Sequence, residues 1–70
     1  MKSNVIQIDP EILSGTPVFK GTRVPIKNLF DYLETGDSVE DFLIDFPSVT
    51  NEQVVQILKE AELLLTAGTF

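Results

Sequence analysis

The sequence contains no cysteine, no histidine and no tryptophan. Without cysteine and histidine, it offers no disulfide framework, no zinc site of the usual kinds, no histidine or cysteine ligand for haem, and no Ser–His or Cys–His nucleophile pair. Only carboxylates and lysines remain as candidates for catalysis. We therefore expect a protein that is not an enzyme and that has no cofactor and no bound metal.

Long apolar runs are also missing. No apolar run exceeds three residues, the length of Leu63-Leu64-Leu65, which is far shorter than a membrane span. The apolar stretch near the N-terminus contains Gln7 and Asp9, so it is too polar for the core of a signal peptide. These features predict a soluble, cytoplasmic protein.

Basic residues are scarce, with five Lys and Arg against eleven Asp and Glu and a net charge of −6. Residues 1–27 hold four of the cations and two carboxylates, whereas residues 28–70 hold nine carboxylates and Lys59 alone. The N-terminal part of the sequence is therefore net positive, and the remainder is net negative. Any polyanion is expected to meet its N-terminal end.

The length of 70 residues sets an upper limit of one domain, which we place at residues 1–70. A chain this short buries only about 60% of its surface on folding, so burial of apolar surface barely offsets the cost of ordering the chain. No disulfide or metal stabilises it further. We therefore expect a partner subunit to complete the core, most simply a second copy in a homodimer.

Residues 1–24 are predicted to form a strand and hairpin segment. Val5, Ile6 and Ile8 indicate a short strand. Two further β-prone runs, residues 16–19 and 22–24, flank Lys20-Gly21 and predict a hairpin around a glycine turn.

Residues 25–67 are predicted to form three helices. Their boundaries follow from proline, glycine and capping-box signals: Pro25 to Gly36, Ser38 (with Asp41) to Pro47, and Thr50 (with Gln53) to Gly68. Each helix carries one apolar stripe: Ile26, Leu29, Phe30 and Leu33; Val39, Phe42, Leu43 and Phe46; and Val54, Ile57, Leu58, Ala61, Leu64 and Leu65. The predicted fold is mainly α, a three-helix helix-turn-helix bundle with a short N-terminal strand and hairpin.

Four residues in and after the glycine turn are candidates for contacting phosphates: Lys20, Thr22, Arg23 and Lys27. Cations and hydroxyls of this kind position a protein on a nucleic-acid backbone without reading its sequence. The alternative is a structural turn in which Arg23 pairs with a carboxylate, because a guanidinium suits a carboxylate as well as a phosphate.

The third helix is a candidate recognition helix, with Asn51, Gln53 and Gln56 near its start. Asn and Gln side chains read adenine edges in the major groove. The same helix holds three glutamates against one lysine, which is too few cations for a phosphate backbone. The alternative is therefore a bundle helix with a solvated outer face.

An acidic row, Asp37, Asp41 and Asp45, repeats every four residues. Carboxylates in such a row could hold Mg²⁺. A solvated helix face is the simpler interpretation, and a docking surface for a basic partner is a third.

Five apolar or aromatic residues lie outside the stripes or beyond the last helix: Tyr32, Ile44, Val55, Leu63 and Phe70. A monomer can expose a few such side chains without functional consequence. Because the isolated chain is only marginally stable, we interpret them instead as a dimer or partner interface.

The run Gly15-Thr16-Pro17-Val18-Phe19-Lys20-Gly21-Thr22-Arg23-Val24-Pro25 resembles the signature G-x-P-V-x-x-G-T-R-[IV]-P of a small prokaryotic family. That family was catalogued as a domain of unknown function and is assigned to antitoxins. Later markers also fit, and the resemblance spans about residues 5–65; these markers are Gly36 with Ser38, Phe46-Pro47, and Thr50. Relatives often carry Lys or Arg where this chain has Thr16, so its basic patch is thinner.

The resemblance implies a homeodomain-like helix-turn-helix fold and a role as the antitoxin of a type II toxin–antitoxin pair. Such a protein would bind and neutralise a PIN-like ribonuclease toxin encoded nearby, and could also bind its own operator DNA. Two alternatives remain open: a stand-alone helix-turn-helix transcriptional regulator, and a homodimeric interaction module that binds no DNA.

Overall fold

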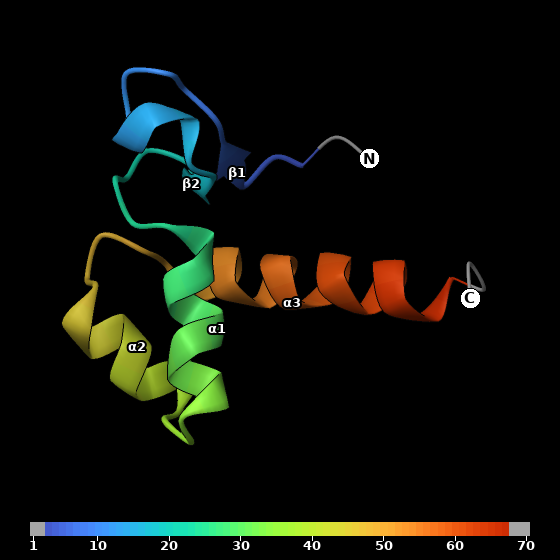
Figure 1. Ribbon diagram of the computed structural model, residues 1–70. Coiled ribbons are helices and arrows are strands. Elements are labelled where there is room, and N and C mark those ends of the chain that lie inside the picture. The colour runs from blue at the N-terminus through green and yellow to red at the C-terminus, as the bar shows by residue number, and fades with distance from the viewer. Residues whose placement is uncertain (1–2, 68–70) are drawn as a thin grey trace.

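The N-terminal third of the chain folds as a small antiparallel sheet. In the computed structural model, which describes residues 3–67, β1 (Ile6–Gln7) pairs with β2 (Val18–Phe19). A 3₁₀ turn, η1 (Leu13–Gly15), lies in the connection between them. Both residues of β2 are fully buried, so this strand joins the sheet to the helices that follow (Figure 1).

The hairpin differs from the one expected, because the partner of β2 is β1 and residues 22–24 form no regular strand. They approach β2 through hydrogen bonds of 3.0 Å from the Phe19 N–H to the Val24 carbonyl and from the Thr22 N–H to the Phe19 carbonyl, and the next residue, Pro25, forms a bridge with Val18. Proline has no N–H to donate, so Pro25 cannot extend this second ladder.

Three helices make up the rest of the described chain: α1 (Ile26–Glu34), α2 (Val39–Asp45) and α3 (Asn51–Thr66). Both predicted capping boxes are confirmed, with hydrogen bonds of 3.0–3.1 Å at the starts of α2 and α3. Gly36 follows α1 with φ +87°, a conformation that glycine adopts at low cost. The predicted end at Gly68 lies outside the described residues.

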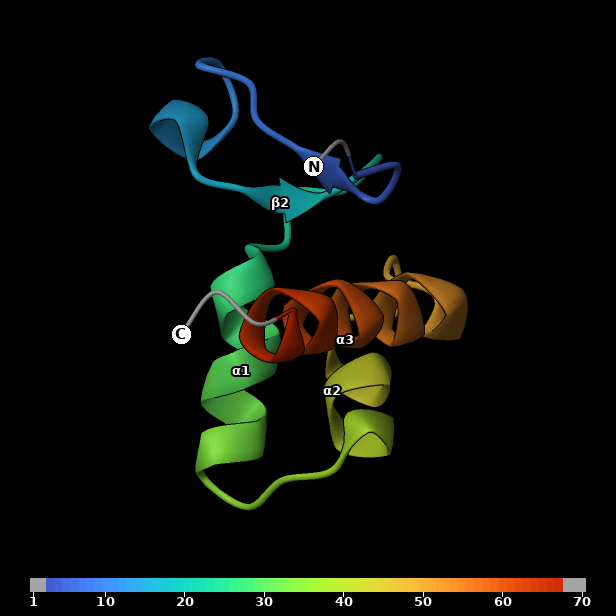
Figure 2. The same cartoon turned by 90° about the vertical axis from the view of Figure 1, so that its right-hand side faces the viewer.

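The helices pack with α1 and α2 side by side and α3 crossing them (Figures 1 and 2). The fully buried side chains come from β2 and from each of the helices: Val18, Phe19, Leu29, Phe42 and Val54. The predicted mainly α, three-helix fold with a short N-terminal sheet is therefore confirmed.

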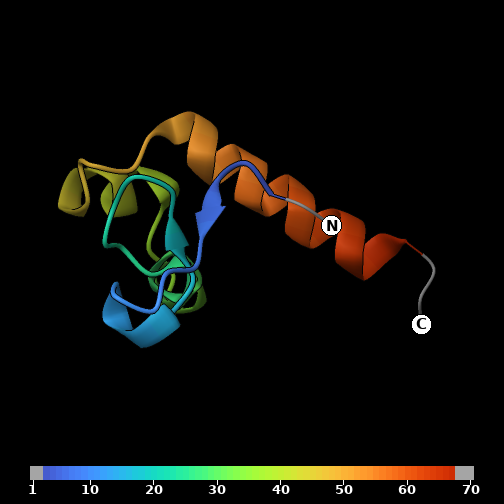
Figure 3. The same cartoon turned by 90° about the horizontal axis from the view of Figure 1, so that it is seen from above.

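The C-terminal half of α3 departs from the prediction. Leu64 and Leu65, expected in the core, are 63% and 62% exposed, and Leu63 is 55% exposed. With sixteen residues, α3 is about 24 Å long. Because it crosses α1 instead of running along it, its last turns extend beyond the bundle (Figures 1 and 3). None of the helices within residues 3–67 is long and apolar enough to cross a membrane.

The capping box of α2 makes stability depend on pH. Hydrogen bonds from Ser38, the backbone N–H first and the side chain second, lower the pKa of Asp41. A carboxyl group whose pKa is lower in the folded state stabilises the fold above its unfolded pKa of about 3.9, and this contribution is lost as the pH falls through the folded pKa.

We therefore expect Asp41→Ala to lower the Tm at about pH 7, with a difference from the native chain that shrinks steadily below about pH 4. Thermal melts followed by circular dichroism would measure this. Glu40→Ala is the matched control, because Glu40 is an exposed carboxylate in the same first turn that makes no capping bond. An equal loss in both variants would contradict the assignment to the cap.

Candidate functional site

The basic patch is smaller than the sequence suggests. Lys20 and Arg23 are exposed on the turn after β2. Thr22 is only 8% exposed, and its hydroxyl donates to the Phe19 carbonyl at 2.8 Å and accepts the Val24 N–H at 3.0 Å. Thr22 is thus a structural residue of the turn and is not free to contact phosphate, which corrects that part of the predicted patch.

Lys27 is exposed but already has a partner. Its Nζ lies 2.8 Å from an oxygen of Asp31, one turn further along α1. The hydrogen bond and the charge of Asp31 raise the pKa of Lys27. A phosphate would have to compete with this carboxylate, so Lys20 and Arg23 are the better placed cations of the patch.

The amides at the start of α3 are largely engaged within the fold. Gln53 Nε2 donates to the Lys20 carbonyl at 2.9 Å, while its Oε1 accepts a backbone N–H of the α3 cap. Gln56 Nε2 donates to Glu60 Oε2 at 3.0 Å. Asn51 is exposed and makes no side-chain hydrogen bond within residues 3–67. Of the three residues predicted to read base edges, therefore, Asn51 alone has a side-chain amide that makes no hydrogen bond within residues 3–67.

The acidic row lies beside a shallow depression of about 300 Å³ lined by Tyr32, Asp37, Asp41, Ile44 and Asp45. Each of its aspartates accepts a local hydrogen bond, and the Tyr32 hydroxyl donates to Asp45. That bond raises the pKa of Tyr32. No three acidic side chains in the described part of the chain lie close enough to hold a metal ion together.

The predicted interface residues in the described part of the chain come from three helices. Ile44 on α2 is 74% exposed, and Val55 and Leu63 on α3 are 41% and 55% exposed. Tyr32 is half-buried and packs edge-to-face against Phe42 and Phe46, with ring centroids 5.5 and 5.8 Å apart. The fold itself therefore accounts for Tyr32. Phe70 lies outside the described residues.

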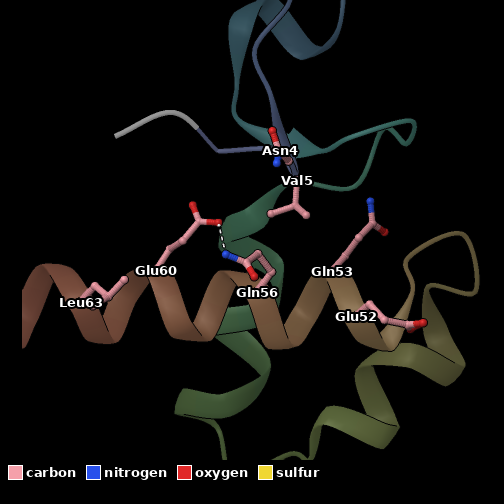
Figure 4. Close-up of a pocket in the computed structure, with 7 residues that line it drawn as sticks. All are labelled: Asn4, Val5, Glu52, Gln53, Gln56, Glu60 and Leu63. Carbon is pink, nitrogen blue, oxygen red and sulfur yellow. Dashed lines mark hydrogen bonds between the residues drawn. The ribbon is translucent and has the colours of Figure 1, made fainter.

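A further surface lies along α3, where the predicted residues Gln53, Gln56 and Leu63 meet residues that the sequence analysis did not single out. Two depressions meet there at Glu60. One, of about 540 Å³, is lined by Asn4, Val5, Glu52, Gln53, Gln56, Glu60 and Leu63 (Figure 4). The other, of about 240 Å³, is lined by Ser3, Ile6, Ile26, Phe30, Ile57, Glu60, Ala61 and Leu64.

Glu60 is the functional candidate that the sequence reasoning missed. It is 9% exposed and accepts hydrogen bonds from Ser3 and Gln56, at 3.1 and 3.0 Å. The signal was present in the sequence, because Glu60 follows Ile57 by three residues and precedes Leu64 by four. A carboxylate at that spacing interrupts an apolar helix face.

The chain matches a protein family and is similar to a protein of Sinorhizobium fredii. The family described as "Protein of unknown function (DUF433)" matches residues 6–61. The chain is also similar to the "Uncharacterized protein y4eO" of Sinorhizobium fredii (strain NBRC 101917 / NGR234), with 40% identity over 50 residues. Those residues are 71% of this chain and 23% of that protein, so the chain spans about a quarter of its relative's length. No solved structure matches significantly.

Proposed function

Because the chain belongs to the DUF433 family, whose description assigns no activity, we propose a function from its surfaces: it binds a partner protein through the end of α3. In this proposal the partner is a nuclease-type toxin, and the chain is its antitoxin. The toxin is suggested by the resemblance of the run from Gly15 to Pro25, and the binding surface by the fold.

One observation carries the proposal, the exposure of Leu63, Leu64 and Leu65 on a helix end that extends beyond the bundle. Consecutive helical residues point about 100° apart, so these three side chains cover most of the circumference of α3. One helix face of the bundle cannot bury all of them. Clusters of exposed leucine of this kind mark protein–protein contact sites.

The charges favour a protein partner over DNA. The candidate DNA surface has two uncommitted cations, Lys20 and Arg23, whereas binding through about six phosphates needs a matching number. On α3 itself, the carboxylates outnumber Lys59. A chain acting by occlusion needs no catalytic group, so we propose that it carries out no reaction of its own.

The test is co-expression with the product of the adjacent reading frame. We expect a stable complex on affinity purification and inhibition of that protein's ribonuclease activity. Failure of the two proteins to co-purify would contradict the proposal. In parallel, a specific shift of the native promoter at physiological salt, weakened by Arg23→Ala, would support the stand-alone regulator instead.

A further inference from the structure

The geometry points to a basic, amphipathic helix as the occupant of the surface around Glu60. We infer that a helical segment of the partner protein lies in the apolar depression beside α3 and places one arginine or lysine against the Glu60 carboxylate. This inference rests on the proposed function for the existence of a partner, and it adds the chemistry that the partner must have.

The apolar part of the surface is a groove between three elements. The smaller depression is bordered by β1, the first turns of α1 and the part of α3 from Ile57 onward, through Ile6, Ile26, Phe30, Ile57, Ala61 and Leu64. Ile57 is buried in the core, whereas Leu64 is mostly exposed at the open end. An amphipathic helix fits such a groove by laying its apolar face into it.

The polar part of the surface is the Glu60 carboxylate, which has no cationic partner among residues 3–67. Glu60 Oε2 accepts both hydrogen bonds, from the Ser3 hydroxyl and from Gln56, and both donors are neutral. The one ion pair among residues 3–67 is Lys27–Asp31, so no described cation pairs with Glu60. A largely buried charge with neutral partners is costly, and a cation from a binding partner removes part of that cost.

The second oxygen of Glu60 remains available to such a cation. Oε1 accepts no hydrogen bond from the described residues. Glu60 is 9% exposed and lines both adjoining depressions, so its carboxylate can be reached from them. Figure 4 shows the Glu60 side chain rising from α3 toward the N-terminal segment, next to Gln56.

Carboxylates outnumber cations on α3, where Glu52, Glu60 and Glu62 stand against Lys59 alone. Glu62 and Glu52 lie on the same helix, and the last turn of α3 carries no basic residue to offset the negative end of the helix dipole. A cationic segment is therefore attracted to this end of the molecule, and an acidic or neutral one is not. This charge is the reason to prefer a basic partner helix over a second copy of the acidic chain.

The experiment uses two synthetic helices of about 14 residues, rich in leucine and alanine, that carry either one central arginine or its neutral isostere citrulline. Each peptide also carries one tryptophan, whose fluorescence reports binding because the protein has none. We expect the arginine peptide to bind the native chain at least about 10-fold more tightly than the citrulline peptide.

Glu60→Gln is the diagnostic variant, because the amide keeps an oxygen for the Ser3 and Gln56 bonds while removing the charge. It is expected to fold and to bind both peptides equally. Glu62→Gln, an exposed change of the same charge on the same helix, should keep the preference for arginine. A thermal melt of each variant separates loss of binding from loss of folding.

Three results would overturn the inference: equal binding of the two peptides to the native chain, a preference unchanged in Glu60→Gln, or no binding at about 1 mM peptide. Self-association of the chain that the peptide does not reverse would overturn it too, since a second copy would then cover the groove. The peptide test uses no neighbouring gene product. Its failure would therefore not contradict a positive co-purification result, and failed co-purification would not contradict a positive peptide result.

Discussion

Phe42→Ala is expected to lower the free energy of unfolding by about 3–5 kcal/mol, the usual cost of removing a fully buried phenylalanine side chain. The Phe42 side chain has no exposed surface, and its ring lies 5.0 Å from the Phe46 ring and 5.8 Å from the Phe19 ring, measured between centroids. Its ring also packs against Tyr32 on α1, so Phe42 joins α2 to both β2 and α1. A chain of 70 residues has a total stability of only about 4–10 kcal/mol, so the variant should be largely unfolded or close to it.

Urea denaturation followed by circular dichroism measures this loss. The control is Ile44→Ala, two residues further along α2, where the side chain is 74% exposed and the expected change is within about 0.5 kcal/mol. A loss below about 1 kcal/mol for Phe42→Ala would show that the aromatic cluster does not hold the fold together.

Raising the protein concentration in the same denaturation experiment tests the predicted homodimer, because a dimer's apparent stability rises with concentration.

The helical part of the fold could be predicted because its signals are local. A capping box needs only a Ser or Thr and a side chain three residues later, and both boxes form as expected at Ser38 and Thr50. Proline and glycine boundaries are local in the same sense. The apolar spacing then identified the buried face correctly for Leu29, Phe42 and Val54.

The strand pairing could not be predicted from the same kind of signal. Ile6 pairs with Phe19 across a connection of twelve residues, and such a pairing depends on which partner the folded chain brings close. The run 22–24 has the composition of a strand and lies nearer in sequence. It follows a tight turn and ends at Pro25, so it forms a bridge in place of a ladder.

The exposure of Leu64 and Leu65 was not predicted, because periodicity identifies a helix face but does not give the length over which that face is covered. The α3 stripe continues through Leu64 and Leu65, yet α1 has only nine residues and crosses α3 toward the N-terminal end of α3 (Figure 1). The apolar spacing is the same in the part of α3 that packs on the bundle and in the part that extends beyond it. Glu60 lies in the covered part, close to where it ends, and hydrogen bonds from Ser3 and Gln56 make its burial possible.

The largest effect on partner binding is expected from removing the apolar end of α3. Replacing both Leu64 and Leu65 by glutamine should weaken the complex with the neighbour-encoded protein at least about 100-fold, because burying each leucine side chain in an interface is worth about 1.5–3 kcal/mol. Glutamine has a helix propensity close to that of leucine. Since both side chains are more than half exposed, the free energy of unfolding of the isolated chain should change by less than about 1 kcal/mol.

Ile44→Gln provides the matched control, an apolar-to-polar change at an exposed position on α2, away from the α3 end. Isothermal titration calorimetry compares partner binding by the native chain, the double variant and Ile44→Gln. Ile44 lies with the acidic row in one depression and Leu64 lies in another, so the comparison shows which surface binds the partner. If the partner binds the α3 end, the double variant loses affinity and Ile44→Gln does not. The reverse pattern would move the interface to α2, and unchanged binding in both would remove the apolar surface from the mechanism altogether.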